Sequence, residues 1–167
     1  EIISSNTRSS LIKLNAVLSS IKELRTEIAN AKERLRSSNR KTILFIDEVH
    51  RFTSVQQDAL LPSIENGTIT FIGATTENPF FAVNKALISR ARIFSLLPLN
   101  QNDLKKIIDK VIKYYSCLKD SKVVEIKEEA INHLIKFSGG DARNLINALE
   151  LGISITKENK ENLVVID

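Results

Sequence analysis

A short apolar run that ends in two carboxylates constrains the fold of this chain more than any other stretch. Residues 43–46 are all apolar, and Asp47 and Glu48 follow them directly. A brief, β-rich run that is apolar on both faces is typical of a strand buried in a parallel sheet. In open α/β sheets, ligands bind beyond the carboxyl ends of the strands. The two acids are therefore predicted to lie where such a sheet binds its ligand.

Asp47 and Glu48 also have a chemistry that suits this position. Strands often stop at a charge, but neighbouring carboxylates repel each other, so packing alone explains the pair poorly. A phosphate bound with Mg²⁺ uses both acids: one holds the ion through water, and the other orients or deprotonates the attacking water. We interpret the pair as part of such a site.

Composition limits the class of protein. Of 167 residues, 43% are hydrophobic and 26% are charged, which is typical of a globular protein with one domain or two small ones. No apolar run approaches the ~20 residues of a membrane-spanning helix, and the start has no basic-then-apolar signal pattern. The single cysteine, Cys117, excludes an internal disulfide and fits a reducing compartment. We expect a cytoplasmic protein with no membrane partner.

The net charge of +4 belongs to the first part of the chain. Residues 1–97 contain 13 Lys and Arg against 9 Asp and Glu, whereas residues 98–167 contain 11 of each kind. A positive excess suits a polyanion such as a nucleotide or a nucleic acid. The excess is too small to establish DNA binding by itself.

Before Pro98, strand-like and helix-like segments alternate. Ser20 and Glu23 form the pattern of a capping box, in which each side chain bonds a free N–H at a helix start. The alternation predicts an α/β fold, a parallel sheet flanked by helices. The predicted strands are 9–17, 43–46, 68–74 and 93–97, and the predicted helices are 21–36, 55–65 and 84–89.

After Pro98 the pattern becomes helical. Asn100 can cap the first of these helices. We therefore predict two domains, an α/β part over 1–97 and a small helical domain over 98–167. The predicted helices are 101–118, 127–137 and 141–155, and the one strand pattern in this part is 163–166.

Three stretches of the chain together resemble one family. They are ILFIDEVHRF (43–52), QQDALLPSIENGTITFIGATTENPFF (56–81) and GGDARNLINALE (139–150). The three are similar to AAA+ ATPases of the RarA/Mgs type, the replication-associated recombination proteins and relatives of the Werner-helicase-interacting ATPase. The resemblance covers about residues 10–155. It implies a P-loop NTPase sheet of the AAA+ class, followed by a helical lid.

The resemblance assigns roles to the acids and to the polar residues after the next strand. Asp47 would be the Walker B carboxylate that holds Mg²⁺ through water, and Glu48 the base that polarises the hydrolytic water. Thr76, or alternatively Asn78, would be sensor 1, a polar group that contacts the γ-phosphate and positions that water. Without the resemblance, Thr75 and Thr76 would be explained as a strand end that bonds its own loop.

Two arginines complete the implied site. Arg90 would be the arginine finger that clamp-loader-like ATPases present to the nucleotide of the neighbouring subunit, with Arg92 as the alternative. Developing phosphate charge requires a donor that is always charged and forked. Arg143 would be sensor 2, a lid arginine that contacts phosphate in its own subunit. Both arginines also have an ordinary explanation, a bond to a neighbouring carboxylate.

The resemblance also implies cofactors and partners. The cofactors would be ATP and Mg²⁺, and the active protein would be a homo-oligomer that hydrolyses ATP at its subunit interfaces. It would act on forked or single-stranded DNA in replication-fork maintenance, recombination and repair. Single-strand-binding protein and other replication proteins are the partners that this role suggests. The location would be the cytoplasm, at the nucleoid in a bacterium.

The sequence departs from the family in one large respect. It contains no G-x-x-x-x-G-K-S/T loop, which in the family would lie just before Glu1. In the family, the strand that precedes this loop lies between the 68–74 and 93–97 strands. We therefore expect a central fragment that by itself does not bind ATP with useful affinity. We also expect a sheet with a gap, with an altered order, or completed by another chain.

Two rival functions stay open at this stage. A catalytically inert assembly subunit would use Arg90 to complete a neighbour's site, although the presence of Asp47, Glu48 and Arg143 argues against it. A helicase fragment is suggested by Asp47-Glu48-Val49-His50, which resembles a DExH box, but no QRxGRxGR-like run follows. His50 and His133 have no metal-ligand spacing with cysteine or acid.

Overall fold

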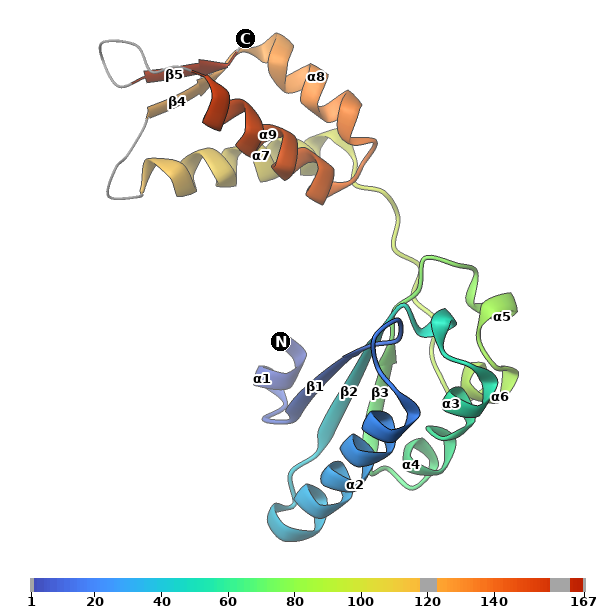
Figure 1. Ribbon diagram of the computed structural model, residues 1–167. Helices are drawn as coiled ribbons and strands as arrows, with labels where there is room; N and C mark the ends of the chain where they lie inside the picture. Colours follow the sequence, from blue (N-terminus) through green and yellow to red (C-terminus); the bar gives the residue numbers. More distant parts are fainter. Residues whose placement is uncertain (1, 118–122, 157–162, 167) are drawn as a thin grey trace. The chain divides into compact units, whose positions relative to one another are not determined.

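The chain folds into two compact units, Glu1–Phe94 and Ser95–Asp167. The computed structural model describes residues 2–117, 123–156 and 163–166 (Figure 1). None of the helices in these ranges is long and apolar enough to cross a membrane.

The first unit is built on a parallel three-stranded sheet. Its strands are β1 (Ser10–Asn15), β2 (Thr42–Asp47) and β3 (Ile69–Gly73), in the order β1-β2-β3. The central strand β2 is buried at every position except Phe45, which is half-buried, and Asp47, which is exposed. The prediction of a parallel α/β sheet is confirmed.

Helices cover this sheet because their apolar residues recur at helical spacing. In α2 (Ile21–Ser38) the side chains of Leu24 and Ala31 are fully buried, and the Ser20 side chain accepts a hydrogen bond from the Glu23 N–H at 3.1 Å. The core also includes Leu44, Ile46 and other buried apolar residues of β2 and its neighbours. The helices are α1 (Ile2–Asn6), α2 (Ile21–Ser38), the 3₁₀ turn η1 (Val49–Arg51), α3 (Ser54–Asp58), α4 (Leu61–Glu65), α5 (Pro79–Ala82) and α6 (Lys85–Ile88).

The prediction of one helix over 55–65 is wrong. The structure has α3 and α4 instead, with a break after Asp58. Pro62 has no N–H with which to bond the Asp58 carbonyl, and its ring crowds that carbonyl. The chain tightens at this point, where the Leu60 N–H bonds the Gln57 carbonyl at 3.2 Å.

The prediction of a strand over 93–97 is also wrong. These residues form no regular structure, and Phe94, Leu96 and Leu97 are 75%, 95% and 84% exposed. Their β-rich composition is real, but a strand exists only when a neighbouring strand bonds its backbone. In the described part of the chain, no strand lies beside this segment.

The second unit is mostly helical, as predicted, and also contains a small parallel sheet. The strand β4 (Val123–Ile126) pairs with β5 (Leu163–Ile166), although only the β5 segment has a strand pattern in the sequence. Its core includes Leu104, Ile108, Leu145, Leu149 and Val164. The elements are α7 (Gln101–Ser116), β4 (Val123–Ile126), α8 (Glu128–Ser138), α9 (Ala142–Ile155) and β5 (Leu163–Ile166); residue 118, the predicted end of the first helix, lies outside the described residues.

The turn between α8 and α9 depends on a glycine at one position. Gly140 has φ +86°, and a Cβ there would lie 2.7 Å from the Cβ of Pro98. Its carbonyl accepts a hydrogen bond from the Leu99 N–H at 3.0 Å. Asp141 then caps α9 by accepting from the N–H groups of Arg143 and Asn144. The turn thereby ties the start of α9 to the segment that enters α7.

Candidate active site

The site begins at the carboxyl end of β2, where the chain makes a sharp turn. Glu48 has φ +53° and ψ +42°, a left-handed conformation that is uncommon for residues other than glycine. The turn is fixed by two backbone bonds to the end of β3: Val49 N–H to the Ala74 carbonyl and Ala74 N–H to the Ile46 carbonyl, each 2.9 Å. These hydrogen bonds to the end of β3 therefore hold Glu48 in its strained backbone conformation.

Glu48 is the centre of a polar cluster. Its Oε2 lies 3.4 Å from the Thr76 hydroxyl and 3.2 Å from His50 Nδ1. His50 Nδ1 also lies 2.9 Å from Thr75 Oγ1, and His50 Nε2 lies 3.5 Å from Glu77 Oε1. The structure thus brings together residues that follow β2 and residues that follow β3, which are 25 to 28 positions apart in the chain.

Asp47 lies beside this cluster and is open to solvent. Its Oδ1 accepts a hydrogen bond from the Glu48 N–H at 3.2 Å, and its backbone carbonyl accepts from the Ala16 N–H at 3.0 Å. The backbone is thus fixed to the end of β1 while the carboxylate is exposed. Such a carboxylate can contact an ion or a bound ligand.

The two alternatives for sensor 1 have different environments. The Thr76 hydroxyl donates to Glu48, as described above. The Asn78 side chain instead caps α5, where its Oδ1 accepts from the Phe80 N–H at 3.1 Å. Asn78 is therefore engaged in helix capping, and Thr76 faces the acid.

Arg90 is bound within its own unit. Its Nε and Nη2 lie 2.7 and 2.6 Å from Oε1 of Glu65, and its Nη1 donates to the Ala86 carbonyl at 2.9 Å. The guanidinium of Arg92 lies 5.5 Å from the centre of the Phe94 ring. The salt bridge of Arg90 is partly exposed on both sides, so it contributes little to stability.

Arg143 lies in the second unit, in the first turn of α9. Its backbone N–H bonds Asp141 at 2.7 Å, and its side chain is exposed. In the described ranges, its guanidinium has no side-chain partner. A cation of this kind is available to bind an anionic ligand.

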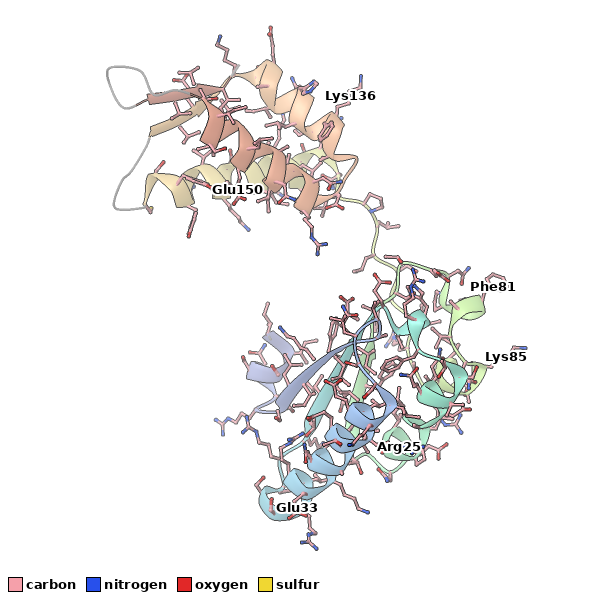
Figure 2. All side chains as sticks on the ribbon, viewed as in Figure 1. Arg25, Glu33, Phe81, Lys85, Lys136 and Glu150 are labelled. Atoms are coloured by element: carbon pink, nitrogen blue, oxygen red, sulfur yellow. The ribbon has the colours of Figure 1, made fainter. Side chains whose placement is uncertain are left out.

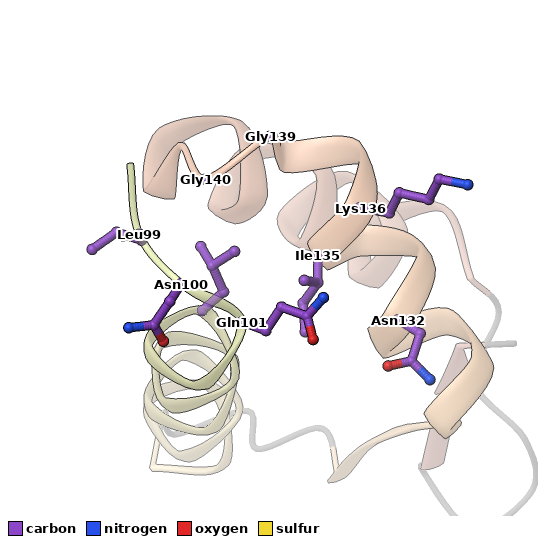
Figure 3. Close-up of a pocket in the computed structure, with 9 residues that line it drawn as sticks. Leu99, Asn100, Gln101, Asn132, Ile135, Lys136, Gly139 and Gly140 are labelled. Atoms are coloured by element: carbon purple, nitrogen blue, oxygen red, sulfur yellow. The ribbon is translucent and has the colours of Figure 1, made fainter. Parts of the chain in front are cut away.

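The second unit also contains a hollow of about 590 Å³ between the start of α7 and the end of α8 (Figure 3). Leu99, Gln101 and Ile135 line it, and Lys136 is the one charged residue in its lining. The acids of the first unit do not contribute to it. Its lining contains no carboxylate and no histidine.

Sequence reasoning missed three members of the cluster around Glu48. The sequence suggests a helicase box for His50 and no metal site. It explains Thr75 as a strand end that bonds its own loop, and it assigns nothing to Glu77. His50 is 4% exposed at the side chain, whereas Glu48 is 33% exposed. A histidine two positions after an acid, in a turn at a strand end, was the available signal.

Oxygen ligands at the end of β2 fit Mg²⁺. No cluster of three or more His, Cys, Asp and Glu side chains that could hold a metal occurs in the described part of the chain. Mg²⁺ in phosphate sites is commonly held by one or two carboxylates, with water and phosphate oxygens as the other ligands. The exposed carboxylate of Asp47 suits that mode of binding.

Comparison with known proteins identifies the family. Residues 1–99 match the family described as "ATPase family associated with various cellular activities (AAA)". The chain belongs to this family. The predicted AAA+ fold and family are therefore confirmed.

Curated AAA relatives are similar over nearly the whole chain. Replication-associated recombination protein A of Haemophilus influenzae is 41% identical over 96% of this chain and 36% of that protein. The same protein of Bacillus subtilis is 37% identical over 98% of this chain and 38% of its own length. ATPase WRNIP1 of Dictyostelium discoideum is 40% identical over 96% of this chain and 18% of its length. The chain therefore spans less than two fifths of these relatives.

A solved structure supports the same AAA fold. RuvB of Thermotoga maritima, described as a Holliday junction branch migration motor, matches with a TM-score of 0.69. The identity is 24%, and the match covers 99% of this chain and 52% of that one. The likeness shows the fold.

Proposed function

We propose that the natural protein that carries this chain binds ATP with Mg²⁺ and hydrolyses it, with Glu48 as the base that polarises water. The observation that carries the proposal is the cluster in which Thr76 and His50 both contact Oε2 of Glu48. Family membership supports it, because AAA proteins are ATPases by description. A carboxylate fixed at the ends of two strands is suited to act as a general base.

Each residue of the cluster has a separate task in this proposal. When bound, Mg²⁺ neutralises phosphate charge, and Asp47 would hold it through water. Glu48 accepts the proton of the attacking water, and the Thr76 hydroxyl orients that water against the γ-phosphate. Asn78 is the weaker candidate for this task, because its side chain caps α5.

The two arginines extend the proposal to an assembly. Arg90 would leave Glu65 and contact the nucleotide of a neighbouring copy, and Arg143 would contact phosphate in its own subunit. The second unit would then be the lid, and the first unit the nucleotide-binding core. A forked, permanently charged donor is what developing phosphate charge requires.

We further propose that the protein acts on DNA. The relatives described above are named for replication-associated recombination, and the first part of the chain carries the positive excess. Forked or single-stranded DNA is the proposed ligand, with single-strand-binding protein or other replication proteins as partners. The role would be fork maintenance, recombination and repair in the cytoplasm, at the nucleoid in a bacterium.

The test is ATP turnover by the natural protein that carries this chain, with and without forked DNA. Glu48→Gln should lower kcat about 100-fold or more, because the water loses its base. Glu33→Gln, at an exposed position of α2, is the matched control and should leave turnover unchanged. If the unsubstituted protein turns over no ATP, the inert-subunit function takes its place.

A further inference from the structure

His50 is a buried histidine beside the proposed base. Its side chain is 4% exposed, and both of its ring nitrogens have polar neighbours. Nδ1 lies between Thr75 Oγ1 at 2.9 Å and Glu48 Oε2 at 3.2 Å, and Nε2 faces Glu77 Oε1 at 3.5 Å. Buried polar groups usually find partners. Here those partners are the base itself and the loop after β3.

The contact engages one oxygen of the Glu48 carboxylate. His50 Nδ1 and the Thr76 hydroxyl both approach Oε2. In the described part of the chain, no partner of Oε1 is found. A carboxylate with one oxygen fixed presents the other in a defined direction, which a general base requires.

The same contact bears on whether Nδ1 carries a proton, which is assigned from the neighbouring atoms. If Nδ1 had only a lone pair, it would face the Glu48 oxygen at 3.2 Å as one acceptor against another. An Nδ1–H instead donates to that oxygen, with the Thr75 hydroxyl oxygen beside it. The hydrogen-bond network therefore favours a proton on Nδ1.

We propose that His50 is a positioning residue for ATP hydrolysis: its Nδ1–H holds Oε2 of Glu48, so that Oε1 faces the attacking water. The proposal rests on the proposed function, because it takes Glu48 as the base. The competing explanation is that His50 fills the turn after β2 and affects stability alone.

Two amide substitutions distinguish the roles of the two ring nitrogens of His50. The Asn amide can occupy the place of Nδ1, whereas the Gln amide reaches the place of Nε2. In the natural protein, His50→Gln should lower kcat about 10- to 100-fold with KM for ATP little changed. His50→Asn should retain most of the activity. His133→Gln, at an exposed position of α8, is the matched control and should change neither constant.

The same variants can also contradict the proposal. Equal losses of kcat in His50→Gln and His50→Asn overturn the proposal, as does full activity of His50→Gln. In a Glu48→Gln background, His50→Gln should cause no further loss, because its effect acts through Glu48. An additive loss in that background also overturns it.

The failure of the inference can be distinguished from failure of the proposed function. If Glu48→Gln turns over ATP normally, the proposed function fails and the inference fails with it. If Glu48→Gln is inactive and His50→Gln is fully active, the inference alone fails.

A measurement on the unsubstituted protein covers the case in which a variant does not fold. Imidazole signals that disappear in His50→Asn and persist in His133→Gln belong to His50. Long-range ¹H–¹⁵N spectra of the imidazoles should show a proton on Nδ1 of His50. A proton on Nε2 alone overturns the proposal.

Discussion

The strand ends of the first unit and the hollow beside α7 and α8 in the second unit differ in their polar groups. In the first unit, Glu48, His50 and Thr76 contact one another across the ends of β2 and β3. In the second unit, a hollow of about 590 Å³ has Lys136 as its one charged lining residue. Proton transfer requires groups held within hydrogen-bond reach. The candidate chemistry therefore lies at the strand ends, and the size of a hollow is a poor guide to it.

Arg90 of the first unit and Arg143 of the second unit differ in their side-chain partners. Both nitrogens of the Arg90 fork meet one Glu65 oxygen, whereas the Arg143 side chain is exposed. Figure 2 shows the side chains of each unit on the ribbon. Arg90 must break its salt bridge with Glu65 before it can contact phosphate. Arg143 has no such salt bridge to break in the described part of the chain. Substitutions in both units test these differences.

Arg90→Ala should cause the largest loss. If Arg90 is the finger, kcat for ATP should fall about 1,000-fold or more, because transition-state charge loses its forked donor. Arg90→Lys should restore little, since an ammonium lacks the fork. Steady-state turnover of the natural protein checks both. A comparable loss in Arg92→Ala, with Arg90→Ala near normal, would assign the finger to Arg92 instead.

Gly140→Ala should destabilise the second unit by about 3 kcal/mol, through left-handed strain and overpacking. The added Cβ would lie 2.7 Å from the Cβ of Pro98. Gly139→Ala is the matched control: it shares a positive φ, +58°, but its Cβ would meet nothing within 4 Å. It should cost about 1 kcal/mol. Urea unfolding measures both, and equal losses would contradict the close approach to Pro98.

Arg143→Ala should weaken ATP binding about 10- to 100-fold, the effect of losing a charged hydrogen bond of about 1.5–3 kcal/mol. Because the side chain is exposed, the melting temperature should stay nearly constant. Titration with a fluorescent ATP analogue measures the affinity. An unchanged affinity would remove Arg143 from the site.

Lys136→Ala should have the smallest effect. Turnover should stay within twofold of the unsubstituted protein, and the free energy of unfolding should change by less than about 0.5 kcal/mol. The same turnover and urea assays apply. A large loss of activity would show that the hollow of the second unit takes part in ATP turnover, contrary to the assignment of the chemistry to the strand ends.

Local patterns were sufficient for much of the fold. Residues 43–46 carry their own signal of burial, and the apolar spacing of 21–36 predicts α2 nearly to its ends. Local patterns failed where the structure of one segment depends on pairing with a second segment. Residues 93–97 are β-rich and form no strand, whereas 123–126 form β4 against a segment 40 positions later. Strand pairing is a property of two segments, which one segment cannot report.

The polar residues at the strand ends, and their order, can be read from the sequence: Asp47 and Glu48, then Thr75 and Thr76. Which of these side chains contact one another depends on the pairing of the strands. Parallel pairing sets the end of β2 beside the end of β3, and that register brings His50 and Thr76 to one oxygen of Glu48. Backbone bonds between strands fix such distances, and composition along a single segment does not.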